Sequence, residues 1–222
     1  MTNPRPTIAV IGGTGALGSG LARRWVRAGY SVIIGSRDAA KAAQTAAGLG
    51  SPAARGMTMA DAARAADIVV VAVPFANQID TLAAIAPGCA NKLVIDTTVP
   101  LVPPKVGTVQ LPDADSAATI ARLNLDSSVK VVSAFHNVSA AKLQADGPIA
   151  CDVLVFGDEP ASRDTAIRLV EAAGLRGFHG GPLANSAAAE ALTSVLITIN
   201  RLYKVDGAGI RIVGKRADGT DL

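Results

Sequence analysis

The chain has 222 residues, of which 50% are hydrophobic, 18% charged and 3% aromatic, and its formal net charge is +3. This composition is typical of one globular domain, or of one domain with a small appendage, with enough apolar residues for a sizeable core. The lysines and arginines are scattered, without basic runs or interleaved aromatic residues, so nucleic acid is not an expected partner. A small anionic ligand explains the same charge balance.

Membrane insertion and metal binding are also disfavoured by the sequence. Residues 1–7 contain no apolar signal-peptide core, and the longest apolar runs, such as residues 68–73, are too short to span a bilayer. We therefore expect a cytoplasmic protein without a membrane partner. Cys89 and Cys151 have neither CxxC spacing nor a histidine nearby, so we expect buried free thiols and no metal.

The first predicted strand, residues 7–12, leads through a glycine-rich turn into a predicted helix over residues 16–28. In a dinucleotide-binding turn, Gly13 would permit the tight turn, Gly15 would let the backbone approach the pyrophosphate, and Gly18 would let the helix pack closely. The start of the helix offers free N–H groups and a positive dipole end to the anion. The predicted binding residues of this turn are Gly13, Thr14, Gly15, Ala16, Leu17 and Gly18.

The second predicted strand, residues 31–35, is followed by Ser36 and Arg37, and Lys41 lies one turn into the next predicted helix, residues 39–49. NAD sites usually place Asp or Glu here to bind the ribose hydroxyls. The hydroxyl and the two cationic side chains are instead donors suited to a 2′-phosphate, so the sequence favours NADP. Alternatively, the two cations are merely solvated residues at a helix start, where positive charge is mildly unfavourable.

Strand-like and helix-like segments continue to alternate, with strands predicted at 67–73, 93–96 and 129–134 and helices at 76–85 and 116–123. The apolar runs are nearly continuous, as in strands buried on both faces of a parallel sheet. The pattern predicts an α/β fold with a doubly wound, Rossmann-type parallel sheet. A proline-rich connection over residues 99–112 interrupts the alternation, and long irregular loops in compact domains are usually functional.

The last part of the chain predicts a strand at 152–156, a helix at 161–173, a short strand at 175–178 and a long helix at 185–203. Apolar residues at three- and four-residue spacing in the long helix indicate core packing or a dimer face. We expect an NADP-binding domain over residues 1–140. A smaller C-terminal subdomain over residues 141–222 would complete the acceptor site, and the tail from Gly214 would fray.

In a doubly wound sheet the ligand lies across the carboxyl ends of the strands. His136 follows one of these ends and is a candidate hydrogen-bond donor or positioning residue, a general acid, or a satisfied polar residue at a strand end. His179 is expected to be a loop residue. The further candidates at the strand ends are Val73, Pro74, Phe75, Val99, Pro100, Ala134 and Asn137.

The residues that are absent narrow the chemistry. A short-chain dehydrogenase would carry a tyrosine and a lysine four residues apart, and neither Tyr30 nor Tyr203 has such a partner. Hydroxyacid and imine reductases carry a larger helical second domain than this length supplies. Hydride transfer to a cofactor-like acceptor needs little acid–base help and fits better than carbonyl reduction.

Several stretches together resemble the NADPH:coenzyme F420 oxidoreductases, and the resemblance covers nearly the whole chain. These stretches are residues 11–18, residues 35–37 with Lys41, and residues 73–75, 99–100, 133–136 and 181–186. The resemblance implies direct hydride transfer between the nicotinamide C4 and a stacked deazaflavin C5, in a homodimer, with neither a metal nor a covalent intermediate. It implies that Thr14, Ser36, Arg37 and Lys41 bind NADP and that Val99, Pro100, Ala134 and His136 line the pocket for coenzyme F420.

Two segments depart from the pattern of that family. Residues 96–98 place an acid and two hydroxyls where a more neutral, proline-bearing segment is expected, and residues 137–139 replace a segment that usually contains proline. Both flank the implied acceptor pocket. An NADPH-dependent reductase of a flavin or another small acceptor therefore stays open as an alternative, as does a non-catalytic NADP sensor.

Overall fold

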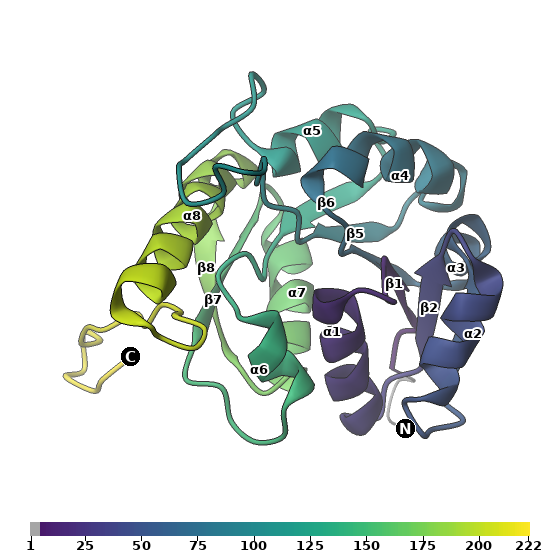
Figure 1. Cartoon of the computed structure of the whole chain (residues 1–222), viewed down its shortest axis with the longest axis horizontal. Helices are drawn as coiled ribbons and strands as arrows, with labels where there is room; N and C mark the ends of the chain where they lie inside the picture. Colours follow the sequence, from purple (N-terminus) through teal and green to yellow (C-terminus); the bar gives the residue numbers. More distant parts are fainter. Residues whose placement is uncertain (1–4) are drawn as a thin grey trace.

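The computed structural model describes residues 5–222, which form one eight-stranded sheet with helices on both faces (Figure 1). The strand order is β3-β2-β1-β4-β5-β6-β7-β8. The strands are β1 (Ile8–Ile11), β2 (Val32–Ser36), β3 (Ala54–Thr58), β4 (Ile68–Val71), β5 (Leu93–Asp96), β6 (Lys130–Ser133), β7 (Asp152–Gly157) and β8 (Arg176–Gly181).

The connections between the strands are mostly helical. The α-helices are α1 (Ala16–Arg27), α2 (Ala39–Ala47), α3 (Met59–Ala65), α4 (Gln78–Ile85), α5 (Ala117–Leu123), α6 (Ala140–Gln144), α7 (Pro160–Ala172) and α8 (Ser186–Tyr203). Short 3-10 helices are η1 (Phe75–Asn77), η2 (Ala86–Gly88) and η3 (Leu183–Asn185).

Strands β1 to β6 are parallel, and the direction changes once, between β6 and β7. Phe156 near the end of β7 pairs with Ser133 at the end of β6, so most of β7 and its parallel partner β8 extend beyond the carboxyl end of β6. The doubly wound parallel sheet is confirmed for β1 to β6. The domain boundary near residue 140 stays a prediction, because the sheet continues across it.

Side chains of the central strands alternate between two apolar cores, one on each face of the sheet. Ile8 and Val10 of β1 pack with α1, α2 and α7 on one face, whereas Ala9 and Ile11 pack with α3, α4 and α5 on the other. All four side chains are fully buried. Burial on both faces explains why these strands are nearly continuous apolar runs rather than alternating ones.

Most predicted α-helices and strands match observed ones within three residues at each end, and one strand and two α-helices were not predicted. His179, which was expected in a loop, lies in β8 because this strand continues to Gly181. Strand β3 lies at the sheet edge, its side chains are at most partly buried, and it carries Arg55 and Gly56, so it lacks the apolar run by which the other strands were predicted. Helices α3 and α6 have 7 and 5 residues, too few for a clear helical period. The tail folds back on itself, with a β-bridge between Lys215 and Asp221 and a hydrogen bond from Arg176 to the backbone oxygen of Leu222, and its expected fraying stays a prediction.

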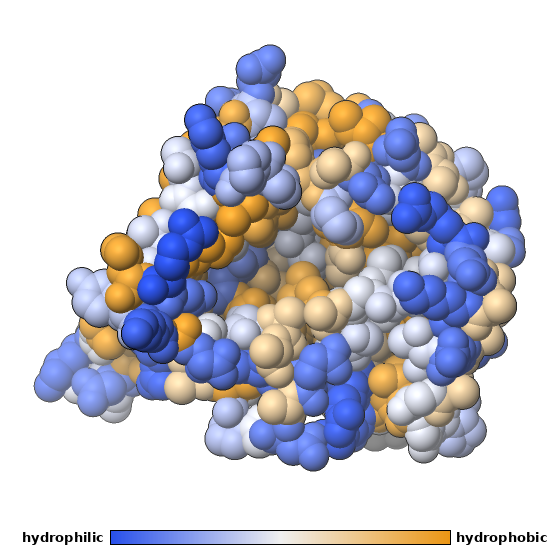
Figure 2. Space-filling view, viewed as in Figure 1, coloured by the Kyte–Doolittle hydropathy of each residue, from blue (hydrophilic) through white to orange (hydrophobic). Residues whose placement is uncertain are grey.

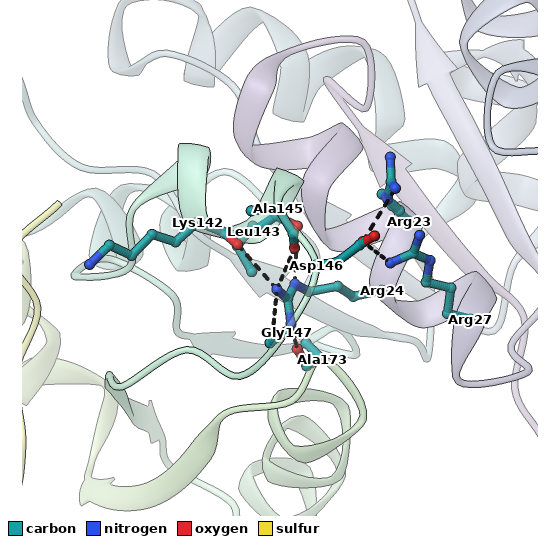
Figure 3. A network of polar contacts seen from close by, with 9 residues as sticks. All are labelled: Arg23, Arg24, Arg27, Lys142, Leu143, Ala145, Asp146, Gly147 and Ala173. Atoms are coloured by element: carbon teal, nitrogen blue, oxygen red, sulfur yellow. Dashed lines mark hydrogen bonds and ion pairs between the residues drawn. The ribbon is translucent and has the colours of Figure 1, made fainter. Parts of the chain in front are cut away.

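Arg24 of α1 joins the first part of the chain to the last (Figure 3). Its guanidinium donates to the carbonyl oxygens of Lys142, Leu143, Ala145, Gly147 and Ala173 at 2.8–3.1 Å. These carbonyls lie at and after the end of α6 and just after α7, where helical N–H partners are missing. One side chain of the predicted NADP-binding domain thus binds the carboxyl ends of two helices, α6 and α7, that lie at the start of and within the predicted C-terminal subdomain.

Candidate functional site

The carboxyl ends of β1, β2 and β4 surround a pocket of about 170 Å3. Its lining includes Thr14, Ser36, Arg37, Val73 and Pro74, all predicted from the sequence to lie at the site. On the face shown in Figure 2 the molecule is hollowed between α8, α6 and the start of α1, and apolar side chains form part of the floor. The structure therefore brings the predicted nucleotide residues together at the edge where α/β sheets bind ligands.

The glycine turn has the close approaches that a dinucleotide-binding turn needs. Gly12 has φ 79°, so the residue in the left-handed region precedes Gly13, to which the sequence analysis assigned the turn. A Cβ on Gly18 would lie 2.7 Å from the carbonyl oxygen of Gly12, closer than van der Waals contact allows. The packing role predicted for Gly18 therefore has a direct steric basis.

The start of α1 offers unused positive potential to an anion. Gly15 occupies the N-cap position, no side chain caps the helix, and its first turn contains no acidic residue. The first N–H groups of a helix lack internal partners and attract phosphate. The turn and helix start fit a pyrophosphate group, which would accept these N–H groups.

Two cationic side chains that follow β2 have no anionic partner among the described residues. Within residues 5–222, Arg37 and Lys41 form no side-chain hydrogen bond or ion pair, and both are exposed. Asp38, the acidic residue beside Arg37, caps α2 by accepting the N–H of Lys41 at 3.1 Å. Because this carboxylate is committed to the helix, Ser36, Arg37 and Lys41 remain available for a phosphate.

A second pocket, of about 150 Å3, lies between the end of β6 and α8. Its walls include His136, Asn137 and Ser139 on one side and Thr193 and Asn200 on the other. Phe135 just before it has φ 67°, which is unusual for an aromatic residue, and its ring packs edge-on against Trp25. This strained residue turns the chain at the end of β6 and sets the direction of His136, a signal that only the structure carries.

His136 is a neutral side chain. Burial lowers its pKa to about 3, and its Nε2 lies 2.7 Å from the hydroxyl of Ser133. A histidine that is uncharged at neutral pH and anchored to a serine is unsuited to act as a general acid. Of the alternatives from the sequence, this geometry disfavours the general acid and agrees both with positioning and with a satisfied polar residue at a strand end.

The remaining predicted residues of the acceptor side differ in access. Asn137 uses its amide to donate to the carbonyl of Ala189 at 2.8 Å and to the Thr193 hydroxyl at 3.1 Å, so it ties this loop to α8. Ala134 is fully buried and lies below the surface, and Pro100 is also buried, whereas Val99 and Phe75 are half-buried. The backbone thus gathers these residues at one edge, but not all of them reach the surface.

Two buried carboxylates lie beneath the acceptor side and were not predicted as a pair. Burial raises the pKa of Asp96 to about 6 although Thr98 and Gln78 donate hydrogen bonds to it. Burial likewise raises the pKa of Glu190 to about 7, although it accepts the N–H groups of Ala117 and Ala118. Their spacing of nearly a hundred residues explains why no sequence motif marked them.

These raised pKa values predict a stability that falls as pH rises. Each carboxyl binds its proton more tightly in the folded state than in the unfolded state. The resulting stabilisation is present at low pH and is lost as pH rises through the folded-state pKa values of about 6 and about 7. Glu190→Gln removes one of these titrations. We subtract the unfolding free energy of the variant from that of wild type. This difference is expected to be about 1–3 kcal/mol smaller at pH 8 than at pH 5. Urea unfolding of both proteins at the two pH values measures it, and a pH-independent difference would contradict the assignment.

A larger cavity, about 440 Å3, lies away from this edge, beside the amino end of β6. Arg122 there donates to the carbonyls of Leu125 and Val129, and Lys130 pairs with Glu159, so its charged groups already have partners. Throughout residues 5–222, no cluster of histidine, cysteine or acidic side chains is arranged to hold a metal ion, and no helix is long and apolar enough to cross a membrane.

Known proteins resemble this chain over most of its length. A family model described as NADP oxidoreductase, coenzyme F420-dependent, matches residues 7–100. The F420-dependent NADP reductase of Methanothermobacter thermautotrophicus is 41% identical over 217 residues, which cover 92% of this chain and 94% of the relative. The reductase of the same name from Methanocaldococcus jannaschii is 35% identical over 219 residues, with 92% and 97% covered.

Solved structures repeat the fold. That of a candidate F420-dependent NADP reductase from Arthrobacter sp. FB24 has a TM-score of 0.80 and 25% identity and covers 94% of this chain and 99% of its own. An imine reductase from Myxococcus stipitatus has a TM-score of 0.63 at 22% identity, and only 63% of its chain is matched. The second similarity concerns the fold alone, and it agrees with the expectation that imine reductases are longer.

Proposed function

Because the chain belongs to the family of F420-dependent NADP reductases, we propose that it transfers hydride directly between NADP(H) and the deazaflavin coenzyme F420. The family makes it an oxidoreductase with these two redox cofactors. One observation supports the NADP half above all. Arg37 and Lys41 have no anionic partner among the described residues, and they follow β2 at the place where NAD sites carry an acid, next to the pocket that the glycine turn borders.

The NADP half of the proposed site extends from β2 to the start of α1. The N–H groups at the start of α1 bind the pyrophosphate, and Gly15 at the N-cap keeps the approach to them free of a side chain. Gly13 is required by the fold itself, because a Cβ there would lie 2.7 Å from the carbonyl oxygen of Val10. Ser36, Arg37 and Lys41 hold the 2′-phosphate by charge-assisted hydrogen bonds. Val73, Pro74 and Phe75, which follow β4, border the nicotinamide end.

The acceptor half lies on the side of β5, β6 and α8. Val99 and Pro100 after β5, and Ala134 and His136 after β6, are the proposed lining for the deazaflavin, and Asn137 fixes their loop to α8. The second pocket, lined by His136, Asn137 and residues of α8, supports the placement of His136 and Asn137. Among the described residues, the linings of the two pockets at this edge contain no aspartate or glutamate, and burial lowers the pKa of His136 to about 3.

The mechanism then depends on position rather than on proton transfer by the protein. When bound, the two cofactors supply a hydride donor at one ring and an acceptor at the other. The chain holds NADP by its phosphates, packs apolar groups around the acceptor side and keeps His136 neutral, so that no charged imidazole disturbs the transfer. Fixing two reactants near contact distance can lower a barrier by roughly 7–11 kcal/mol.

An absorbance assay tests the function. The purified protein is mixed with NADPH and, in separate wells, with coenzyme F420, FMN, FAD or a quinone. We expect rapid bleaching of the deazaflavin and little NADPH oxidation with the other acceptors. Oxidation with FMN or FAD alone would support a flavin reductase on the same scaffold. Tight NADP binding without oxidation by any acceptor would support the sensor alternative and overturn the proposal.

We also propose that two copies associate through α8 and the tail. Leu202 and Tyr203 at the end of α8 are 71% and 75% exposed, and Val213 in the tail is 86% exposed. Such a group of exposed apolar side chains is typical of an interface. Leu202→Glu is expected to convert a dimer into a monomer without a change in circular dichroism. Light scattering after size exclusion measures both masses, and a monomeric wild type would rule the interface out.

A further inference from the structure

The loop of residues 97–116 joins the end of β5 to the start of α5 and carries Val99 and Pro100. Both of its ends are bound by one side chain, Gln78 at the start of α4. The Gln78 amide nitrogen donates to the carboxylate of Asp96, the last residue of β5, at 2.5 Å. The same nitrogen donates to the carbonyl of Ala117, the first residue of α5, at 2.8 Å. Gln78 therefore closes the base of the loop.

The hydrogen bonds continue from this base into the loop itself. The other oxygen of Asp96 accepts the backbone N–H of Thr98 at 3.1 Å and the Thr98 hydroxyl at 2.6 Å. Gln78, Asp96 and Thr98 are all buried, and Thr98 directly precedes Val99. The chain of contacts thus ends next to the first residue proposed to touch the acceptor.

The far end of the loop is bound to α8. Glu190 is fully buried and accepts the N–H of Ala117 at 2.7 Å and that of Ala118 at 3.1 Å. Its neighbour one turn later, Thr193, lies in the wall of the pocket that contains His136. Asp96, Gln78 and Glu190 therefore link the two walls of the proposed acceptor site through residue Ala117.

The cluster leaves one buried hydrogen-bond acceptor without a partner, which costs stability. Gln78 is fully buried, and within residues 5–222 its side-chain oxygen has no hydrogen-bond partner. An unpartnered buried amide oxygen is destabilising, and an apolar residue of similar size would avoid the penalty. The nitrogen cannot exchange places with the oxygen, because both of its partners are acceptors. What Gln78 supplies in return is the fixed position of the loop.

We propose that Gln78, Asp96 and Glu190 are positioning residues that hold Val99 and Pro100 in place against the bound acceptor. The proposal rests on the proposed function, since it needs Val99 and Pro100 to line the acceptor site. It also explains the acid and hydroxyls at residues 96–98. Asp96 and Thr98 are buried below the site, where they hold the loop and do not meet the acceptor.

A matched pair of substitutions separates positioning from general stability. Thr98→Val removes the hydroxyl that donates to Asp96, and Thr97→Val removes a neighbouring hydroxyl that donates to the carbonyl of Val71 at 2.9 Å. The two threonines are 2% and 3% exposed, so the packing change is alike. We expect Thr98→Val to raise the KM for coenzyme F420 about 5- to 10-fold, and Thr97→Val to leave it within about twofold.

The readouts distinguish the possible failures. The KM for NADPH and the melting temperature are measured for both variants, and both variants are expected to bind NADPH like wild type. Gln78→Met is expected to raise the KM for coenzyme F420 at least as much as Thr98→Val. Equal acceptor KM values for Thr98→Val and Thr97→Val in an active enzyme overturn the positioning proposal. A wild type that binds NADPH but never reduces coenzyme F420 overturns the proposed function instead.

Discussion

Replacing Arg37 with alanine is expected to raise the KM for NADPH about 10- to 100-fold and to leave the KM for NADH nearly unchanged. The guanidinium stands exposed at the end of β2, without an ion-pair partner within residues 5–222, beside the pocket that the glycine turn borders. Its loss removes one or two charge-assisted hydrogen bonds to the 2′-phosphate, each worth about 1.5–3 kcal/mol at most. NADH lacks that phosphate, so its binding does not depend on these hydrogen bonds.

Steady-state kinetics with both nucleotides and one acceptor measures the effect. Arg168→Ala on α7 is a suitable control, because this residue is exposed and, within residues 5–222, its guanidinium donates a hydrogen bond only to Thr165 of its own helix. Removing it lowers the net charge equally. Equal losses for NADPH and NADH in Arg37→Ala, or an equal loss of NADPH affinity in Arg168→Ala, would rule out a specific 2′-phosphate contact.

The nucleotide half of the site could be predicted because its signals are local in the sequence. The glycines follow a strand that is buried on both faces, and Ser36 and Arg37 follow the next strand, so a few consecutive residues define each part. Parallel pairing then places the ends of β1 and β2 side by side. Sequence spacing alone therefore located the pocket that the structure shows.

The acceptor half could be predicted only in outline. Residues after β5 and β6 were placed correctly at the carboxyl edge, but their burial depends on contacts between distant segments. Asp96 looked like an acid in the pocket, and the structure buries it beneath the loop under Gln78. Glu190 lies on the buried side of α8, where the regular spacing of apolar residues predicts a purely apolar face. No local pattern shows that such a carboxylate caps a helix far away in sequence.

The change of strand direction after β6 also had no signal in the sequence. The run of residues 152–157 is as apolar as the strands before it, and β7 and β8 are parallel to each other. Only the two residue pairs between β6 and β7 reveal the reversal. Because β7 and β8 extend beyond β6, they bring α8 over the site, where Asn137 and Thr193 join it to the end of β6.

Removing the guanidinium of Arg24 is expected to destabilise the protein by about 3–5 kcal/mol. Hydrogen bonds to charged groups contribute about 1.5–3 kcal/mol each, but the five carbonyls share one group and several meet solvent, so the sum is far from additive. Desolvation by burial, together with the neighbouring charge of Arg27, lowers the pKa of Arg24, in agreement with a charge that is partly withdrawn from water. Arg24→Ala leaves the ends of α6 and α7 without a donor.

Arg27 provides a matched control one turn later in the same helix. It forms an exposed ion pair with Asp146, and such pairs contribute about 0–1 kcal/mol, so Arg27→Ala should unfold in urea almost like wild type. Since α6 follows the loop that contains His136, Arg24→Ala should also weaken binding of coenzyme F420 more than binding of NADPH in the folded fraction. Equal stability losses in the two variants would mean that Arg24 contributes only surface charge, and that the carbonyls are satisfied by water.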